Sequence, residues 1–203
     1  IPIPTLEDLK NPLDEVIEPR ATQEEMTNFI ETELTESLKG LPTRTTQFGR
    51  FDKGLAYTIL MKYYMHEKNW AKAEECGREL LKAEYGYGLM DRYADIFTLE
   101  NEGNKEIIFA CTEERGTNLQ LWHDHALPGN YPTKNASIQK WDGYKVPWPF
   151  YRTFEEGDDR LSVLVGEYVG TDGVLFNEES DIAKHGNLYS GAVPVKYGED
   201  PES

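Results

Sequence analysis

The sequence predicts a mainly α-helical fold, in which antiparallel helix pairs pack against a loop-rich region with a few short strands. Three amphipathic segments lie between residues 22 and 84, each with apolar residues at the spacing of a helix face. The connections between them are short, which predicts antiparallel neighbours. Beyond residue 84 the helical period is lost and turn-forming residues become frequent.

The first helix is predicted to start at Thr22. Thr22 and Glu25 have the spacing of a capping box, in which each side chain bonds a backbone amide at the helix start. Its apolar stripe consists of Met26, Phe29, Ile30, Leu34 and Leu38. Gly40 and Pro42 predict its end, and the prolines before residue 20 predict extended chain.

The next two helices are predicted as a pair joined by the turn at residues 67–69. Asp52 is the expected N-cap of the second helix, which is predicted as amphipathic from Leu55, Ile59, Leu60, Tyr63 and Tyr64. The third helix runs from about Trp70 to Ala83, with Ala73, Leu80 and Leu81 on its inner face. Trp70 is expected to pack between helices.

Only short elements are predicted after residue 84. Tyr93–Phe97 is predicted as a short helix, and Glu106–Cys111 contains an apolar run typical of a buried strand. One helical turn is expected over Phe150–Phe154 and a strand over Leu161–Val169. Residues 170–203 are predicted as turns.

Composition excludes some partners. The formal net charge is −16, which disfavours nucleic acid and electrostatic docking on anionic lipid. No apolar run approaches the roughly 18 residues of a membrane span. The chain has no initiator Met and begins in an extended segment, which predicts a processed chain or a fragment. Cys76 and Cys111 are expected as small buried residues, with a bridge between them left open.

The second and third helices together resemble one tetratricopeptide repeat. Large, small and aromatic residues fall at suitable offsets: Tyr57, Leu60, Tyr64, Ala73 and Leu80. Met61 and Gly77 depart from that pattern, which prefers a small residue at the first and an aromatic residue at the second. A single helix pair needs neighbours to bury its face.

Four blocks in the order of one family extend this resemblance. The first joins Gly49–Arg50, Lys53–Tyr57 and Leu60–Met65, and the second is Lys68–Ala73. Tyr93–Phe97 with Asn104–Phe109, and then Phe154–Arg160, complete the set. Together these blocks resemble SusD/RagB proteins over about residues 20 to 160.

The resemblance implies a non-catalytic glycan-binding lipoprotein at the outer membrane, which delivers its ligand to a SusC-like TonB-dependent transporter. It implies tetratricopeptide-like helices over 22–84 and a ligand-binding region over 85–203, both parts of one SusD-like domain. No cofactor is implied. Family members are about twice this length, so the chain is expected to be partial, with its lipid anchor outside it.

Residues 112–150 are the expected sugar-binding stretch. Aromatic faces pack on pyranose rings and polar side chains bond the sugar hydroxyls, and this stretch is rich in both. This stretch holds Trp122, His123, Tyr131, Trp141, Tyr144 and Trp148, beside Asn118, Gln120, Asp124, Asn130 and Asn135. Trp122 and Tyr131 are the first candidates, followed by Trp148, with His123 and Asn130 as polar partners. Trp141 is expected to have a structural role.

Other chemistries have weaker support. The acidic run Glu155, Glu156, Asp158 and Asp159 is expected to form a turn paired with Arg160, because adjacent carboxylates cannot straddle a substrate. His123 and His125 have a spacing that can ligate zinc, but a third ligand is not evident. Asn135–Ser137 matches a glycosylation sequon by its letters only. The alternative to glycan binding is a helical-repeat scaffold that docks another protein, and hydrolysis is a third hypothesis.

Overall fold

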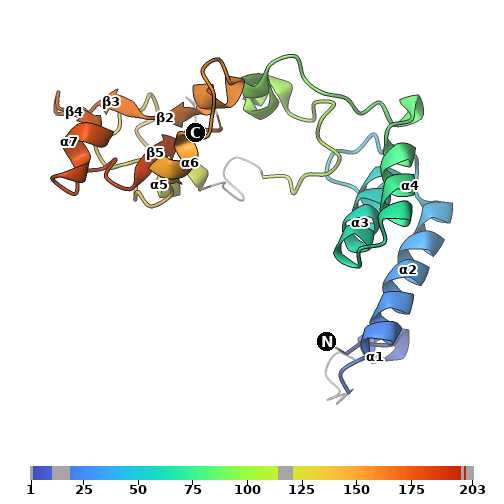
Figure 1. Ribbon diagram of the computed structural model, residues 1–203. Coiled ribbons are helices and arrows are strands. Elements are labelled where there is room, and N and C mark those ends of the chain that lie inside the picture. The colour runs from blue at the N-terminus through green and yellow to red at the C-terminus, as the bar shows by residue number, and fades with distance from the viewer. Residues whose placement is uncertain (1, 11–18, 114–120, 198, 200–203) are drawn as a thin grey trace. The chain divides into compact units, whose positions relative to one another are not determined.

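The computed structural model describes residues 2–10, 19–113, 121–197 and 199. The chain divides into two compact units, of which the first comprises Ile1–Tyr87 and Ile108–Ala110 and the second Gly88–Ile107 and Cys111–Ser203. Helices dominate the described part of the first unit, whereas the second combines short strands, short helices and loops (Figure 1). The prediction of a mainly helical fold with a few short strands is confirmed.

The first unit has helices α1 (Leu6–Lys10), α2 (Gln23–Gly40), α3 (Lys53–His66) and α4 (Trp70–Leu80). Helices α2 and α3 begin at the predicted caps. The extended chain predicted before residue 20 is wrong for α1, because Thr5 and Asp8 bond each other's backbone amides at its start. The capping box at the start of α2 is present, with the Thr22 amide donating to Glu25 Oε2 at 2.8 Å. The Asp52 carboxylate caps α3 by accepting from the Leu55 amide at 3.0 Å.

Helices α3 and α4 form the predicted pair and lie side by side (Figure 1). Lys68 adopts a left-handed backbone conformation in the turn between them, with φ of 59°. The buried cluster of the unit consists of Leu60, Tyr64, Ala73 and Cys76. Met61 and Gly77, which depart from the repeat pattern, face each other, since a Cβ on Gly77 would lie 3.5 Å from Met61 Sδ.

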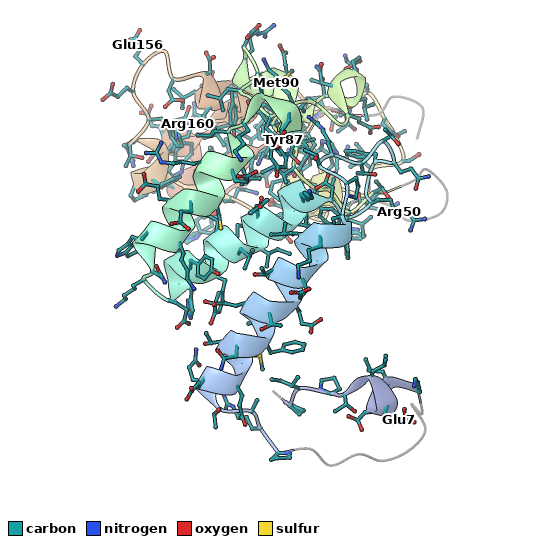
Figure 2. All side chains as sticks on the ribbon, turned by 90° about the vertical axis from the view of Figure 1, so that its right-hand side faces the viewer. Glu7, Arg50, Tyr87, Met90, Glu156 and Arg160 are labelled. Atoms are coloured by element: carbon teal, nitrogen blue, oxygen red, sulfur yellow. The ribbon has the colours of Figure 1, made fainter. Side chains whose placement is uncertain are left out.

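Helix α2 is less completely covered. Leu34 and Leu38 pack against the buried cluster, and Glu31 pairs with Lys72 at 3.1 Å. None of the residues of α2 is buried, however, and Phe29 is exposed. Figure 2 shows side chains extending from α2 on both sides of its ribbon.

Two expectations for α4 are wrong. The helix ends at Leu80, so Leu81 leaves the inner face and is 84% exposed. Trp70 does not pack between helices but is exposed. Trp70 is the first residue of α4, and the buried residues of the helix begin only at Ala73.

Three 3₁₀ helices follow: η1 (Ala83–Tyr85), η2 (Tyr93–Phe97) and η3 (Leu99–Asn101). The short helix expected at Tyr93 is thus confirmed, whereas the strand expected over Glu106–Cys111 is wrong. Asn104 explains this difference, because its Oδ1 accepts from the Glu106 amide and its backbone carbonyl from the Ile107 amide. Those amides are therefore unavailable to a ladder.

The described part of the second unit contains two small antiparallel sheets (Figure 1). In the first, β5 (Gly191–Pro194) lies between β1 (Val146–Pro147) and β2 (Leu164–Val165). In the second, β3 (Glu167–Val169) pairs with β4 (Leu175–Asn177). The remaining elements are α5 (Trp122–Ala126), α6 (Trp148–Tyr151), η4 (Asp159–Val163) and α7 (Glu178–Ile182).

The single strand predicted over Leu161–Val169 is wrong. Its first residues belong to η4, which begins where the Asp158 side chain accepts from the Arg160 amide. Gly166 then separates β2 from β3, which belong to different sheets. The helical turn expected over Phe150–Phe154 starts two residues earlier, as α6. Strand β4, helix α7 and strand β5 all lie in residues 170–203, where only turns were predicted, and the four residues of β5 are buried.

The core of the second unit lies around β5. Its buried residues are Leu127, Trp148, Tyr168, Leu188, Ala192 and Val193. Cys76 is buried as expected, but Cys111 is exposed, and the two cysteines are not bridged. Among the described residues, no helix is both long and apolar enough to cross a membrane.

Candidate functional site: an aromatic row

A continuous row of aromatic rings crosses the second unit. Neighbouring ring centroids are 5.0 to 5.8 Å apart along the whole row. In order, the members are Trp141, His125, Tyr144, Trp122, Tyr197, Phe97 and Tyr93. We call this set the aromatic row.

Exposed rings alternate with half-buried rings along part of the row. Trp141 is 52% exposed, Tyr144 48% and Tyr197 38%. Between them lie His125 and Trp122, which are both half-buried. The half-buried rings therefore support the exposed ones from the protein side, and three aromatic side chains offer surface to solvent.

Helix α5 supplies the two supporting rings. Trp122 and His125 are three residues apart and so share one face of the helix. The indole Nε1 of Trp122 donates to the Pro194 carbonyl at 3.1 Å, which joins the row to the end of β5. Trp122 was a first candidate from the sequence, and the structure places it at the centre of the row.

The loop that carries Trp141 and Tyr144 is fastened to α5 by its backbone. The Trp141 amide donates to the Asp124 carbonyl at 2.6 Å, and the Tyr144 amide to the His125 carbonyl at 2.9 Å. Between the two rings, Asp142 has φ of 60° and pairs with Lys145. This fixed loop conformation exposes Trp141, for which the sequence predicts a structural role.

Tyr197 lies between Trp122 and Phe97 in the row, and Lys196 lies beside both Tyr197 and Phe97. His123 Nε2 lies 2.9 Å from the Tyr197 carbonyl. A carbonyl oxygen can only accept, so Nε2 donates this hydrogen bond and Nδ1 faces elsewhere. The Lys196 ammonium lies over Phe97, 4.2 Å from the ring centroid, and 5.9 Å from that of Tyr197. Sequence reasoning missed Tyr197 and Phe97, because nothing in their spacing links them to Trp122.

Tyr131 and Asn130, also predicted as ligand contacts, are held in a different network. Tyr131 packs on Tyr168 with ring centroids 5.0 Å apart, and burial raises its pKa. Asn130 Oδ1 accepts from the Tyr168 hydroxyl at 2.9 Å and from Asn187 at 2.7 Å. These contacts stabilise the region of β3 and leave both residues outside the aromatic row.

Trp148 belongs to the core. Its side chain is 6% exposed, and its Nε1 donates to the Leu188 carbonyl at 2.8 Å. Asp124 and Asn135 are buried as well, and both accept hydrogen bonds from nearby backbone amides. Asn118 and Gln120 lie outside the described residues.

The acidic turn after α6 is held by an internal ion pair. Arg160 donates to both carboxylate oxygens of Asp158 and lies over the Phe154 ring at 4.8 Å. Hydrogen bonds from the Arg160 side chain hold the pKa of Asp158 at about 2. Glu156 points away from the ribbon at the outside of this turn (Figure 2). The expected pairing of this run with Arg160 is confirmed.

Metal binding gains no support. Within the described ranges, no group of three or more His, Cys, Asp or Glu side chains could hold an ion. His123 and His125 are separately engaged, the first with Tyr197 and the second between Trp141 and Tyr144.

Solved structures with the same architecture identify the fold. A SusD-like protein from Bacteroides fragilis aligns with a TM-score of 0.59 over 76% of this chain, at 24% sequence identity. Surface glycan-binding protein A from Bacteroides thetaiotaomicron, in complex with laminarihexaose, aligns with a TM-score of 0.64 over 87% of the chain, at 18% identity. This chain has a SusD-like fold.

A SusD superfamily protein from Bacteroides fragilis adds a third likeness, with a TM-score of 0.63 over 89% of the chain at 17% identity. The SusD-like chain spans between 30% and 42% of the length of these three proteins. No protein-family model and no curated protein matches it. The resemblance drawn from the four sequence blocks is confirmed at the level of the fold.

Proposed function

We propose that this chain binds a glycan on the aromatic row of its second unit and breaks no bond in it. The observation that carries the proposal is the continuity of the row, in which three rings expose surface beside half-buried supporting rings. The SusD-like fold supports it, because a protein of this fold, surface glycan-binding protein A, is known in complex with laminarihexaose.

The physical basis is stacking. The axial C–H groups of a pyranose pack against an aromatic face, and large rigid rings lose little rotamer freedom when they do so. Trp141, Tyr144 and Tyr197 are the rings with most exposed surface in the row. Because individual contacts of this kind are weak, we expect micromolar to millimolar dissociation constants, about −8 to −4 kcal/mol.

Polar groups beside the row would bond the sugar hydroxyls. His123 and Lys196 lie next to Tyr197. Lys196 carries donors, and Nδ1 of a neutral His123 is an acceptor, because its Nε2 donates to the Tyr197 carbonyl. Of the residues predicted from sequence, Trp122 and His123 therefore stay in the proposed site. Tyr131, Asn130 and Trp148 are left outside it, because their contacts serve the core.

Delivery to a SusC-like TonB-dependent transporter at the outer membrane completes the proposal. Its support is the SusD-like fold and the likeness to a surface glycan-binding protein. The protein would be held at the membrane by a lipid anchor. Co-purification of the full-length protein with the transporter would test this part, and a full-length protein that purifies alone would count against it.

Affinity electrophoresis tests glycan binding directly. The chain is run through native gels that contain a panel of soluble polysaccharides, and retardation in at least one gel is expected. Trp141→Ala should be retarded clearly less than the unchanged chain, whereas Phe150→Ala should be retarded to the same extent as the unchanged chain. Phe150 is the matched control, because it is an exposed aromatic residue of the same unit outside the row.

A helical-repeat scaffold is the second candidate, favoured by exposed apolar residues on the helices. Phe29 on α2 and Ile59 and Met65 on α3 are exposed. This candidate gains if the chain is retarded by no polysaccharide. Hydrolysis is tested separately, since incubation with a retained glycan would produce new reducing ends only if a bond were broken.

A further inference from the structure

Lys196 is a cation held by aromatic rings rather than by an acid. Its ammonium lies over Phe97 and beside Tyr197, and among the described residues it makes neither an ion pair nor a hydrogen bond. All three of its N–H donors are thus left for another partner. This occurs in a chain in which Asp and Glu outnumber Lys and Arg by 37 to 21.

The backbone on both sides of Lys196 is fixed. The preceding residue, Val195, donates from its amide to the Val163 carbonyl at 2.9 Å. The following residue, Tyr197, has its carbonyl bonded by His123 Nε2. A cation on such a fixed segment loses less conformational entropy on binding than one on a free loop.

We propose that the aromatic row takes an acidic glycan, in which Lys196 binds a uronic acid carboxylate while Tyr197 stacks on the same sugar. This inference rests on the proposed function and names the ligand class of that site. In a uronic acid, the carboxylate projects from the rim of the pyranose ring. When such a pyranose stacks on Tyr197, its carboxylate comes close to the Lys196 ammonium, which lies 5.9 Å from the centroid of the Tyr197 ring.

The acidity of the chain does not oppose this placement. At physiological ionic strength, exposed charges more than about 8 Å apart are largely screened. Only charged groups close to the site therefore attract or repel a bound carboxylate. Asp142, the acid in the loop that carries Trp141 and Tyr144, is paired with Lys145. The adjacent His123 adds Nδ1, which accepts from a sugar hydroxyl when the imidazole is neutral.

The test compares each acidic polymer with its own neutral counterpart. The probes are polygalacturonate, alginate and hyaluronate, each beside a carboxyl-reduced form in which the acid has become a primary alcohol. We expect the chain to retain at least one acidic polymer about fivefold more strongly than its reduced form, as for a single exposed ion pair. Added salt should reduce this difference.

Variants of Lys196 and of a control lysine show whether the preference for acidic polymers comes from Lys196 itself or from positive charge elsewhere on the unit. Lys196→Gln should remove the preference and bind both forms equally, and Lys196→Arg should keep it. Lys184→Gln is the matched control, because Lys184 is exposed in the same unit and lies outside the row, and its preference should be unchanged.

Two outcomes would overturn the inference in distinguishable ways. Binding of neutral or reduced polymers that equals or exceeds binding of the acidic ones would overturn the acidic ligand class while glycan binding stands. A Lys196→Gln variant that keeps the preference would overturn the role of the lysine in the same way. Failure to bind any polymer of either kind would overturn both the inference and the proposed function.

Discussion

The indole Nε1 of Trp122 donates a hydrogen bond of 3.1 Å to the carbonyl of Pro194, the last residue of β5. The Trp122 ring also contacts Tyr144 and Tyr197, with centroids 5.3 and 5.6 Å away. A strand of the core therefore positions the centre of the aromatic row. The Trp122 side chain thus links the aromatic row to the core.

Substitutions of Trp122 should separate its hydrogen bond to the core from its ring contacts in the aromatic row. Trp122→Phe keeps a ring but loses the donor, so we expect a loss of about 1 kcal/mol in the free energy of unfolding with most glycan retention kept. Trp122→Ala also removes the support of Tyr144 and Tyr197 and should abolish retention. Urea denaturation and affinity gels measure the two quantities. Full retention by a folded Trp122→Ala variant would contradict the central place of this ring.

Trp148 should affect stability alone. It is buried and bonded to the Leu188 carbonyl, so Trp148→Ala should lower the free energy of unfolding by about 3 to 5 kcal/mol. The exposed Trp141 provides the comparison, since Trp141→Ala should change this free energy by less than about 0.5 kcal/mol. Denaturation curves with equal midpoints for the two variants would be inconsistent with the burial described for Trp148.

Tyr87 and Gly54 give a test of the first unit. Tyr87 Oη is buried and has no hydrogen-bond partner among the described residues, so Tyr87→Phe should raise the free energy of unfolding by about 0.5 to 1 kcal/mol.

A Cβ on Gly54 would lie well inside van der Waals contact with Tyr87 Oη. Gly54→Ala should therefore destabilise α3 by about 1 to 3 kcal/mol, although alanine normally favours a helix. In a Tyr87→Leu background the same substitution should become neutral or stabilising, and an unchanged loss there would show that the clash is absent.

Tyr168 predicts a loss of stability in alkali. Burial raises the pKa of Tyr168 to about 12, whereas tyrosine in an unfolded chain titrates near ~10. The folded state binds the proton more tightly, so this stabilisation is complete below pH ~10 and is lost as the pH rises toward about 12. Denaturation midpoints between pH ~8 and ~12 should fall less steeply in Tyr168→Phe than in the unchanged chain. Parallel curves would rule out this role for Tyr168.

The sequence predicted the parts of the fold that depend on local chemistry. The caps at Thr22 and Asp52 and the paired helices follow from neighbouring residues, and the structure has them. The strand expected after Glu106 failed because Asn104 engages the amides that a ladder needs, which an apolar pattern does not show. Strand β5 was missed because it is a short buried run between turn residues. It forms hydrogen bonds only with β1 and β2, which are distant in the sequence.

The site was predictable only in part, for a similar reason. Composition drew attention to Trp122 and His123, and the structure brings both to Tyr197. Exposure, however, depends on tertiary contacts, and these bury Trp148 while exposing Trp141. Residues far apart in sequence, such as Phe97 and Tyr197, become neighbours only after folding.

The most direct test of glycan binding on the aromatic row is the dissociation constant for the polysaccharide that retards the chain. Calorimetry would measure it for the unchanged chain, Trp141→Ala/Tyr144→Ala and Phe150→Ala. We predict at least about a fivefold weaker affinity for the double variant, since each lost aromatic contact contributes about 0.5 to 1.5 kcal/mol, with Phe150→Ala unaffected. If the double variant, folded and equally stable, binds as tightly as the unchanged chain, the aromatic row is not the glycan site.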